Sequence, residues 1–179
     1  MVGAAAYGHS TAYVKVNMDT PNRMTPKQLW QRIQKGRAAY DAVYAGLNEK
    51  QMTRRPGAQK DWSVKDQIAH LTWWENYALE RTTLMLAGEE TVKLKDFDAI
   101  NAQVFAMNKD LALEDVLAAW RSNLPRFGAL CRSLTETTLN VTRGKRRAPY
   151  WLLVTDTFEH YAEHQPDLER YVASLKKVK

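Results

Sequence analysis

The chain has 179 residues, of which 45% are hydrophobic and 26% charged, and its formal net charge is +6 at pH 7. This length and composition predict one globular domain with a sizeable core, and no apolar run is long enough to cross a membrane. The first residues lack the basic and apolar segments of a signal peptide, and the single cysteine, Cys131, excludes an internal disulfide. A cytoplasmic location is therefore expected.

The positive charge is densest at residues 143–147, and Arg54 and Arg55 form a second pair. Both clusters fall in predicted loops, without interleaved aromatic residues and without a nucleic-acid-binding motif. Such charge is typical of solvated loops, and an anion-binding rim beside a pocket is the alternative. Nucleic acid and membrane are therefore not expected as partners.

The N-terminal part of the chain predicts one helix after an irregular leader. Residues 1–23 show no helical stripe. The first helix should begin at Thr25, with Pro26 at its first position, and should continue to about residue 47. The stretch 48–61 predicts a connecting loop.

Two further helices are predicted in the middle of the chain. Ser63, followed three residues later by Asp66, resembles a capping box, and this helix should end at Gly88. A shorter helix is predicted over residues 96–108.

The C-terminal part predicts two long helices joined by a polar linker. The first spans residues 112–134 and contains Pro125, and the linker spans 135–148. The last helix runs from 149 to about 176 and contains Pro166. Kinks are expected at both prolines because proline removes a backbone donor.

No strand pattern occurs, so the sequence predicts an all-α protein. Four long helices with ordinary connections indicate an antiparallel four-helix bundle, with a short extra helix and an irregular N-terminal leader. The bundle domain should span residues 24–179. An apolar helix face beyond the needs of the core would allow a homodimer.

Three of the four histidines lie on predicted helices. His160 and His164 are four residues apart, which places both on one helix face, and His70 would join them if the two helices pair. Neutral imidazole binds divalent transition metals, and three protein ligands leave a position open, as in catalytic zinc sites. The alternative is that these histidines are satisfied polar residues of the core.

Acidic residues near these histidines suggest further roles. Asp156 and Asp66 each precede a predicted ligand by one turn, so their carboxylates could orient the imidazoles. Glu159 and Glu163 could act as general bases, although solvated positions explain them better.

Aromatic and amide side chains could complete a pocket near the histidines. At helical spacing, aromatic residues more often belong to the core. Asn101 and Gln103 could contact a substrate. The aromatic candidates are Trp73, Trp74, Tyr77, Trp151 and Tyr161.

Four segments follow one another in an order that matches a known family. They are residues 62–71 (WSVKDQIAHL), 97–102 (FDAINA), 113–116 (LEDV) and the pair His160 and His164. Together they resemble the motifs of the DinB/YfiT-like metalloenzymes over about residues 25–175. The segment 159–168 (EHYAEHQPDL) is similar to the ClbS/DfsB-like branch.

The resemblance implies a four-helix bundle in which His70, His160 and His164 hold zinc, nickel or iron, often in a dimer. Relatives include S-transferases that use bacillithiol or mycothiol, and a maleylpyruvate isomerase. The ClbS branch is linked to resistance through opening of a reactive small molecule, and there the metal triad is not a constant feature.

Two functional hypotheses follow. In the first, the protein is a metal-dependent hydrolase or thiol S-transferase that acts on a small, electrophilic molecule. His70, His160 and His164 are then both the metal ligands and the catalytic residues, with a divalent metal and a low-molecular-weight thiol as cofactors. In the second, the bundle is not catalytic and sequesters a hydrophobic or reactive small molecule.

Overall fold

The computed structural model describes residues 24–58, 61–89, 94–140 and 148–176, and these residues form helices without a strand. The leader predicted over residues 1–23 and the basic cluster at 143–147 lie outside the described residues. The helices are α1 (Pro26–Tyr44), α2 (Glu49–Thr53), α3 (Val64–Ala87), α4 (Phe97–Asn108), α5 (Leu113–Ser133), α6 (Glu136–Asn140), α7 (Pro149–Thr155) and α8 (Phe158–Lys176).

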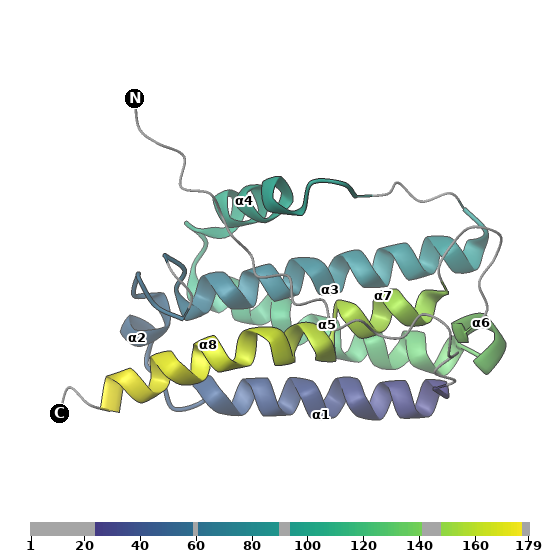
Figure 1. The fold of residues 1–179 in the computed structure, drawn as a ribbon, viewed down its shortest axis with the longest axis horizontal. Helices are drawn as coiled ribbons and strands as arrows, with labels where there is room; N and C mark the ends of the chain where they lie inside the picture. The colour runs from purple at the N-terminus through teal and green to yellow at the C-terminus, as the bar shows by residue number, and fades with distance from the viewer. Residues whose placement is uncertain (1–23, 59–60, 90–93, 141–147, 177–179) are drawn as a thin grey trace.

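Four helical rods form the bundle, namely α1, α3, α5 and the successive pair α7 and α8 (Figure 1). Helix α1 packs against α8 and α5, and α3 packs against α5 and α7. Helix α4 lies outside the bundle against α3, while α2 and α6 lie at its two ends (Figure 1). The predicted all-α four-helix bundle with a short extra helix is confirmed.

Local capping explains where the long helices begin and end. Thr25 caps α1 through a capping box with Gln28, and Pro26 occupies the first turn. Ser63 and Asp66 form the capping box predicted for α3. Gly88 ends α3 with a φ of 81°, a left-handed conformation that glycine adopts without strain.

Two predicted connections contain short helices that the sequence analysis missed. The loop predicted over 48–61 includes α2, which starts with a capping box between Asn48 and Gln51. The linker predicted over 135–148 includes α6. Each short helix buries one apolar side chain: Met52 is 5% exposed and Leu139 is fully buried. One anchor side chain is too little to produce a recognisable periodicity.

The last predicted helix is divided into α7 and α8, which corrects the expectation of one continuous helix. The break falls at Asp156, which has φ −95° and ψ 9°, and the buried hydroxyl of Thr157 donates to the carbonyl of Leu153. Helices α5 and α8 continue through Pro125 and Pro166.

A buried layer of polar side chains separates the two apolar clusters of the core. On α1, Arg37 lies between Ile33 of one cluster and Tyr40 of the other. Arg37 is 2% exposed and Glu75 of α3 is fully buried. We call Arg37, Glu75, Asn123 and Tyr161 the polar layer.

The carboxylate of Glu75 is the centre of the polar layer. Its Oε1 accepts a bond of 2.8 Å from Arg37 Nη1 and a bond from the Tyr161 hydroxyl, and its Oε2 accepts a bond of 3.0 Å from Asn123 Nδ2. Burial raises the pKa of Glu75 to about 7, although Arg37 and the hydrogen bonds lower it. The layer therefore ties α1, α3, α5 and α8 together.

Helices α1 and α8 approach each other closely at Gly36. A Cβ atom added there would lie 2.8 Å from Cβ and 3.3 Å from Cα of Phe158. Within a helix, Gly36 would ordinarily be a weak point. Its absent side chain is instead what allows the first turn of α8, and hence the helix carrying His160 and His164, to sit on α1.

We expect Gly36→Ala to destabilise the protein by about 1–2 kcal/mol, because the cost of overpacking exceeds the better helix propensity of alanine. Urea unfolding followed by circular dichroism measures this change. Gly46→Ala is the matched control, because no atom lies within 4 Å of the added Cβ. Equal stability of the two variants would contradict the close-approach argument.

Candidate metal centre

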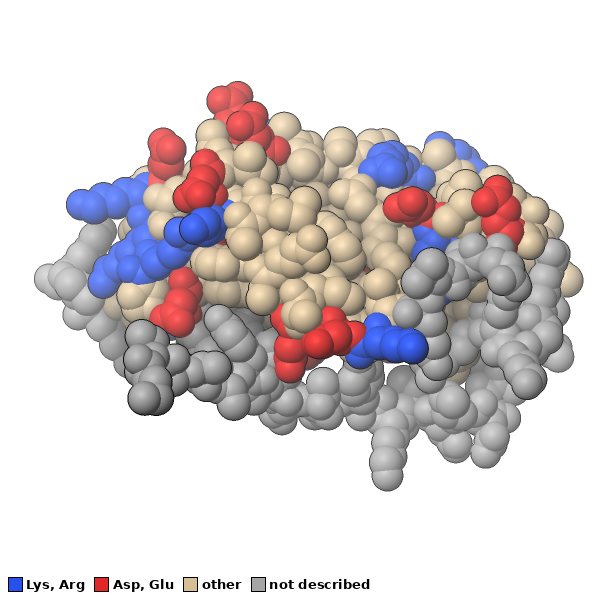
Figure 2. Space-filling model, turned by 90° about the horizontal axis from the view of Figure 1, so that it is seen from above, with Lys and Arg blue, Asp and Glu red and all other residues tan. Residues whose placement is uncertain are grey.

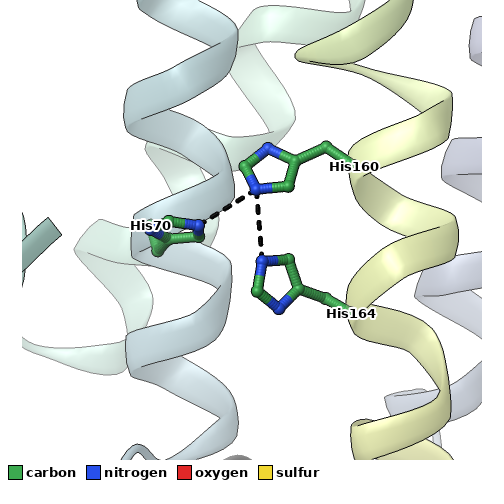
Figure 3. A group of neighbouring side chains, drawn as sticks. All are labelled: His70, His160 and His164. Carbon is green, nitrogen blue, oxygen red and sulfur yellow. Dashed lines mark hydrogen bonds between the residues drawn. The ribbon is translucent and has the colours of Figure 1, made fainter. Parts of the chain in front are cut away.

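Three imidazoles from two helices meet at one point inside the bundle. His70 comes from α3, His160 and His164 come from α8, and the rings point toward one another (Figure 3). Nε2 of His160 lies 3.1 Å from Nε2 of His70 and 3.1 Å from Nε2 of His164. One ligand atom from each residue lies within 4.8 Å of the others. The predicted convergence of the three histidines is confirmed.

The two separations of 3.1 Å are close to those between ligand nitrogens around a single ion. Zn–N bonds of about 2.0–2.1 Å in tetrahedral geometry place ligand nitrogens about 3.3 Å apart. His70 is 3% exposed, His164 is 6% exposed, and His160 is half-buried. Burial and the neighbouring His164 hold the pKa of His160 well below its ordinary value, so its ring is neutral at physiological pH. Neutral imidazole is the form that binds metal, so this group could hold a metal ion.

Asp66 was predicted to orient His70, but its carboxylate has other partners. Its Oδ1 and Oδ2 each accept a bond of 2.6 Å from the guanidinium of Arg55, and Oδ2 also accepts bonds from the backbone and hydroxyl of Ser63. Although burial raises it, the pKa of Asp66 lies below its ordinary value because of these donors. Asp66 thus fixes the start of α3, and Arg55 is an ion-pair partner rather than a solvated loop charge.

Asp156 also differs from the prediction that it orients His160. Its Oδ2 and the Nδ1 of His160 are both buried and have no hydrogen-bond partner within the described residues. Burial raises the pKa of Asp156 to about 8. The carboxyl is therefore mainly protonated at neutral pH.

We expect Asp156→Asn to stabilise the metal-free protein, and more so at high pH. The wild-type carboxyl keeps its proton in the folded state up to about pH 8 but loses it near pH 4 when unfolded, so its contribution to stability falls across this interval. Asparagine should raise the free energy of unfolding by an amount on the order of 2–5 kcal/mol at about pH 8 and by little at about pH 4. Urea titrations at both pH values measure it, and parallel pH profiles for the two proteins would contradict it.

Aromatic rings surround the histidines on the side that faces α4. Trp74 lies edge-on to both His70 and His160, with ring centroids 6.4 and 6.2 Å apart. Trp62, which the sequence analysis did not single out, is closer to His70, at 5.0 Å. Trp62 stacks on Phe105 of α4 at 5.8 Å. Helix α4 therefore covers the imidazoles through an aromatic wall.

The other predicted pocket residues lie elsewhere or have structural partners. Asn101 accepts a bond of 3.1 Å from the indole of Trp74, and Gln103 is exposed. Tyr161 belongs to the polar layer, and Glu159 and Glu163 are exposed. Trp73 and Tyr77 stack on each other. Trp151 packs against the core cluster at the other end of the bundle.

The buried charges of Arg37 and Glu75 were not predicted, although the sequence contains a signal for each. Arg37 follows Leu29 and Ile33 at four-residue intervals and precedes Tyr40, so it occupies the apolar stripe of α1. Glu75 occupies the corresponding stripe of α3, between buried Leu71 and Leu79. A charged residue in an apolar stripe indicates a buried pair.

The fold and the three histidines define an all-helical bundle protein with a group that could hold a metal. Residues 32–166 match the DinB superfamily, and the chain belongs to this family. No curated protein matches the chain. No helix in the described part of the chain combines the length and the hydropathy that a bilayer crossing requires.

Solved structures share this fold at low sequence identity. An uncharacterised protein of Escherichia coli UTI89 has a TM-score of 0.76 at 13% identity, covering 85% of this chain and 95% of its own. The colibactin self-resistance protein ClbS has a TM-score of 0.71 at 13% identity, covering 82% and 94%. The sibling lethal factor precursor DfsB has a TM-score of 0.68 at 14% identity, covering 86% and 96%. The predicted resemblance to DinB-like proteins is confirmed, and the structural neighbours of this chain include ClbS and DfsB.

One of these structures corrects the expectation about partners. The crystal structure of ClbS is a complex with double-stranded DNA. The exclusion of nucleic acid, which rested on the lack of a known motif, is therefore wrong. A protein of this fold is therefore able to bind double-stranded DNA.

Proposed function

We propose that this protein is a metal-dependent enzyme that acts on a small electrophilic molecule, with His70, His160 and His164 as the metal ligands. The observation that carries the proposal is the meeting of three imidazoles, two buried and one half-buried, whose ring nitrogens lie close enough together to hold one ion. Zinc, nickel or iron held there would supply Lewis acidity and acidify a nucleophile, either water for hydrolysis or a low-molecular-weight thiol for transfer.

The surrounding residues support a reaction on an apolar substrate. The neutral ring of His160 adds no positive charge that would repel a cation. Trp62 and Trp74 place apolar aromatic rings beside the imidazoles on the side of α4.

Metal content is the decisive measurement. Protein prepared without a polyhistidine tag should contain close to one transition-metal ion per chain by elemental mass spectrometry, lose it to a chelator and regain it when zinc, nickel or iron is added. The loaded protein is then assayed for ester or amide hydrolysis and for thiol conjugation of electrophiles. Failure to take up any metal would overturn the proposal and favour a bundle that sequesters its ligand without catalysis.

Double-stranded DNA binding is a second candidate function. The complex of ClbS with double-stranded DNA and the net charge of +6 support it. On the face that carries α4, basic and acidic side chains are intermixed around a broad uncharged area (Figure 2). The described charges of that face are therefore not arranged as one basic surface, so the basic cluster at 143–147 is the first segment to test.

Fluorescence anisotropy with a short labelled duplex tests DNA binding. The affinity should fall steeply with salt concentration, because neutralising phosphates releases counterions. Replacing Lys145, Arg146 and Arg147 by serine should weaken binding and flatten the salt dependence. No binding at low salt, or an unchanged slope in the variant, would count against this candidate.

A further inference from the structure

One buried amide joins the histidine group to the core. Gln67 is fully buried on α3, one turn before His70. Its Nε2 lies 3.4 Å from Nδ1 of His164 and 3.5 Å from the carbonyl oxygen of the same residue. This Nδ1 is the ring nitrogen that faces away from the other two imidazoles (Figure 3). Helix α3 thus supplies one histidine and also contacts the back of another.

The amide of Gln67 is itself held by a rigid partner. The hydroxyl of Tyr40 donates a bond of 2.7 Å to Oε1 of Gln67. Tyr40 is fully buried, and its ring packs against Trp120 at 5.9 Å and Tyr161 at 6.3 Å. Because the Tyr40 ring is enclosed on several sides, it fixes the position of the amide.

This chain of hydrogen bonds suits both neutral forms of His164. With Tyr40 donating to Oε1, the amide NH₂ faces Nδ1, so Nδ1 accepts and Nε2 carries the proton. Ligation through Nε2 requires the proton on Nδ1 instead. A half-turn of the amide then presents Oε1 to Nδ1–H and the NH₂ group to the Tyr40 oxygen, which can accept as well as donate. The exchange keeps the hydrogen bonds to Tyr40 and to Nδ1, whereas the longer contact of the NH₂ group with the His164 carbonyl is lost.

We propose that Gln67, anchored by Tyr40, is a positioning residue that aims Nε2 of His164 at the metal and matches its amide to the tautomer of the ring. This inference rests on the proposed function, because it concerns the same three-histidine group. It explains why a fully buried amide lies within the apolar cluster that contains Ile68 and Leu71. An apolar side chain of similar volume would fill the space but leave Nδ1–H of the metal-bound ring without an acceptor.

Zinc affinity of three variants tests the proposal. Competition with a chromophoric chelator gives the affinity, and the visible absorption of bound Co²⁺ reports the ligand geometry. Gln67→Met should bind Zn²⁺ about 10–100-fold more weakly, as expected when a partner of a metal-ligating histidine is removed. Tyr40→Phe should show a smaller loss and an altered Co²⁺ spectrum. Gln67→Glu, whose carboxylate accepts from Nδ1–H, should restore at least wild-type affinity.

Asn123→Leu is the matched control for a general loss of stability. Asn123 is also a buried amide, but its hydrogen-bond partners are Thr72, Glu75 and Arg126 rather than a histidine. It should lower the urea midpoint without changing Zn²⁺ affinity. Wild-type affinity and spectrum in Gln67→Met would overturn the inference and leave the proposed function standing. Absence of Zn²⁺ uptake by the wild-type protein would overturn both.

Discussion

Replacing Arg37 by methionine is expected to lower the free energy of unfolding by about 3–5 kcal/mol, because it removes one partner of a buried ion pair. Arg37 is 2% exposed, and besides Glu75 it donates a bond of 2.5 Å to the carbonyl of Trp120. Methionine preserves much of the side-chain volume but leaves the carboxylate of Glu75 without a cation. Urea unfolding measures the loss.

A double-mutant cycle with Glu75→Gln separates the ion pair from packing. The double variant should be more stable than the sum of the single effects predicts, because it leaves no unpaired charge in the polar layer. The loss in Arg37→Met alone should grow with pH, since protonation of Glu75, whose pKa is about 7 even beside Arg37, relieves the uncompensated charge. Additive losses, or a loss independent of pH, would show that Arg37 acts mainly through its packing.

His160→Ala is expected to reduce Zn²⁺ affinity by about 100-fold or more, because a catalytic-type zinc site depends on three protein ligands. His160 is the member whose Nε2 lies 3.1 Å from each of the other two. Chelator competition measures the affinity, and elemental analysis measures the stoichiometry. Any hydrolase or thiol-transferase activity should fall in parallel.

Glu163→Ala is the control for this prediction. Glu163 lies on the same helix, precedes a proposed ligand and is exposed, so its removal should leave the metal content unchanged. Circular dichroism should show that both variants keep the helical fold. Metal content of His160→Ala equal to that of the wild-type protein would contradict the proposed site.

The long helices and the histidine pair could be predicted because their signals are local. Thr25 and Ser63 are caps that the sequence shows directly, and the four-residue spacing of His160 and His164 fixes a shared helix face. Adding His70 needed the pairing of two distant helices, which periodicity alone does not determine. The resemblance to DinB-like proteins supplied that step.

The missed features depend on contacts between segments that are distant in sequence. Spacing places Asp66 one turn before His70, but the fold brings Arg55 to its carboxylate instead. Likewise, Arg37 and Glu75 are 38 residues apart in sequence and become partners only when the bundle assembles. In each case several partners compete for the same polar side chain, and the assembled bundle determines which of them it contacts.

The separation of His70 from His160 by 90 residues has a consequence for how the protein is made. During synthesis the chain emerges from its N-terminus, so His70 and α3 appear long before α8 exists. A metal ion could be captured by all three imidazoles only after α8 has docked on α1. Loading would then be a late event in biogenesis, and an ion bound there would fasten the last helix to α3.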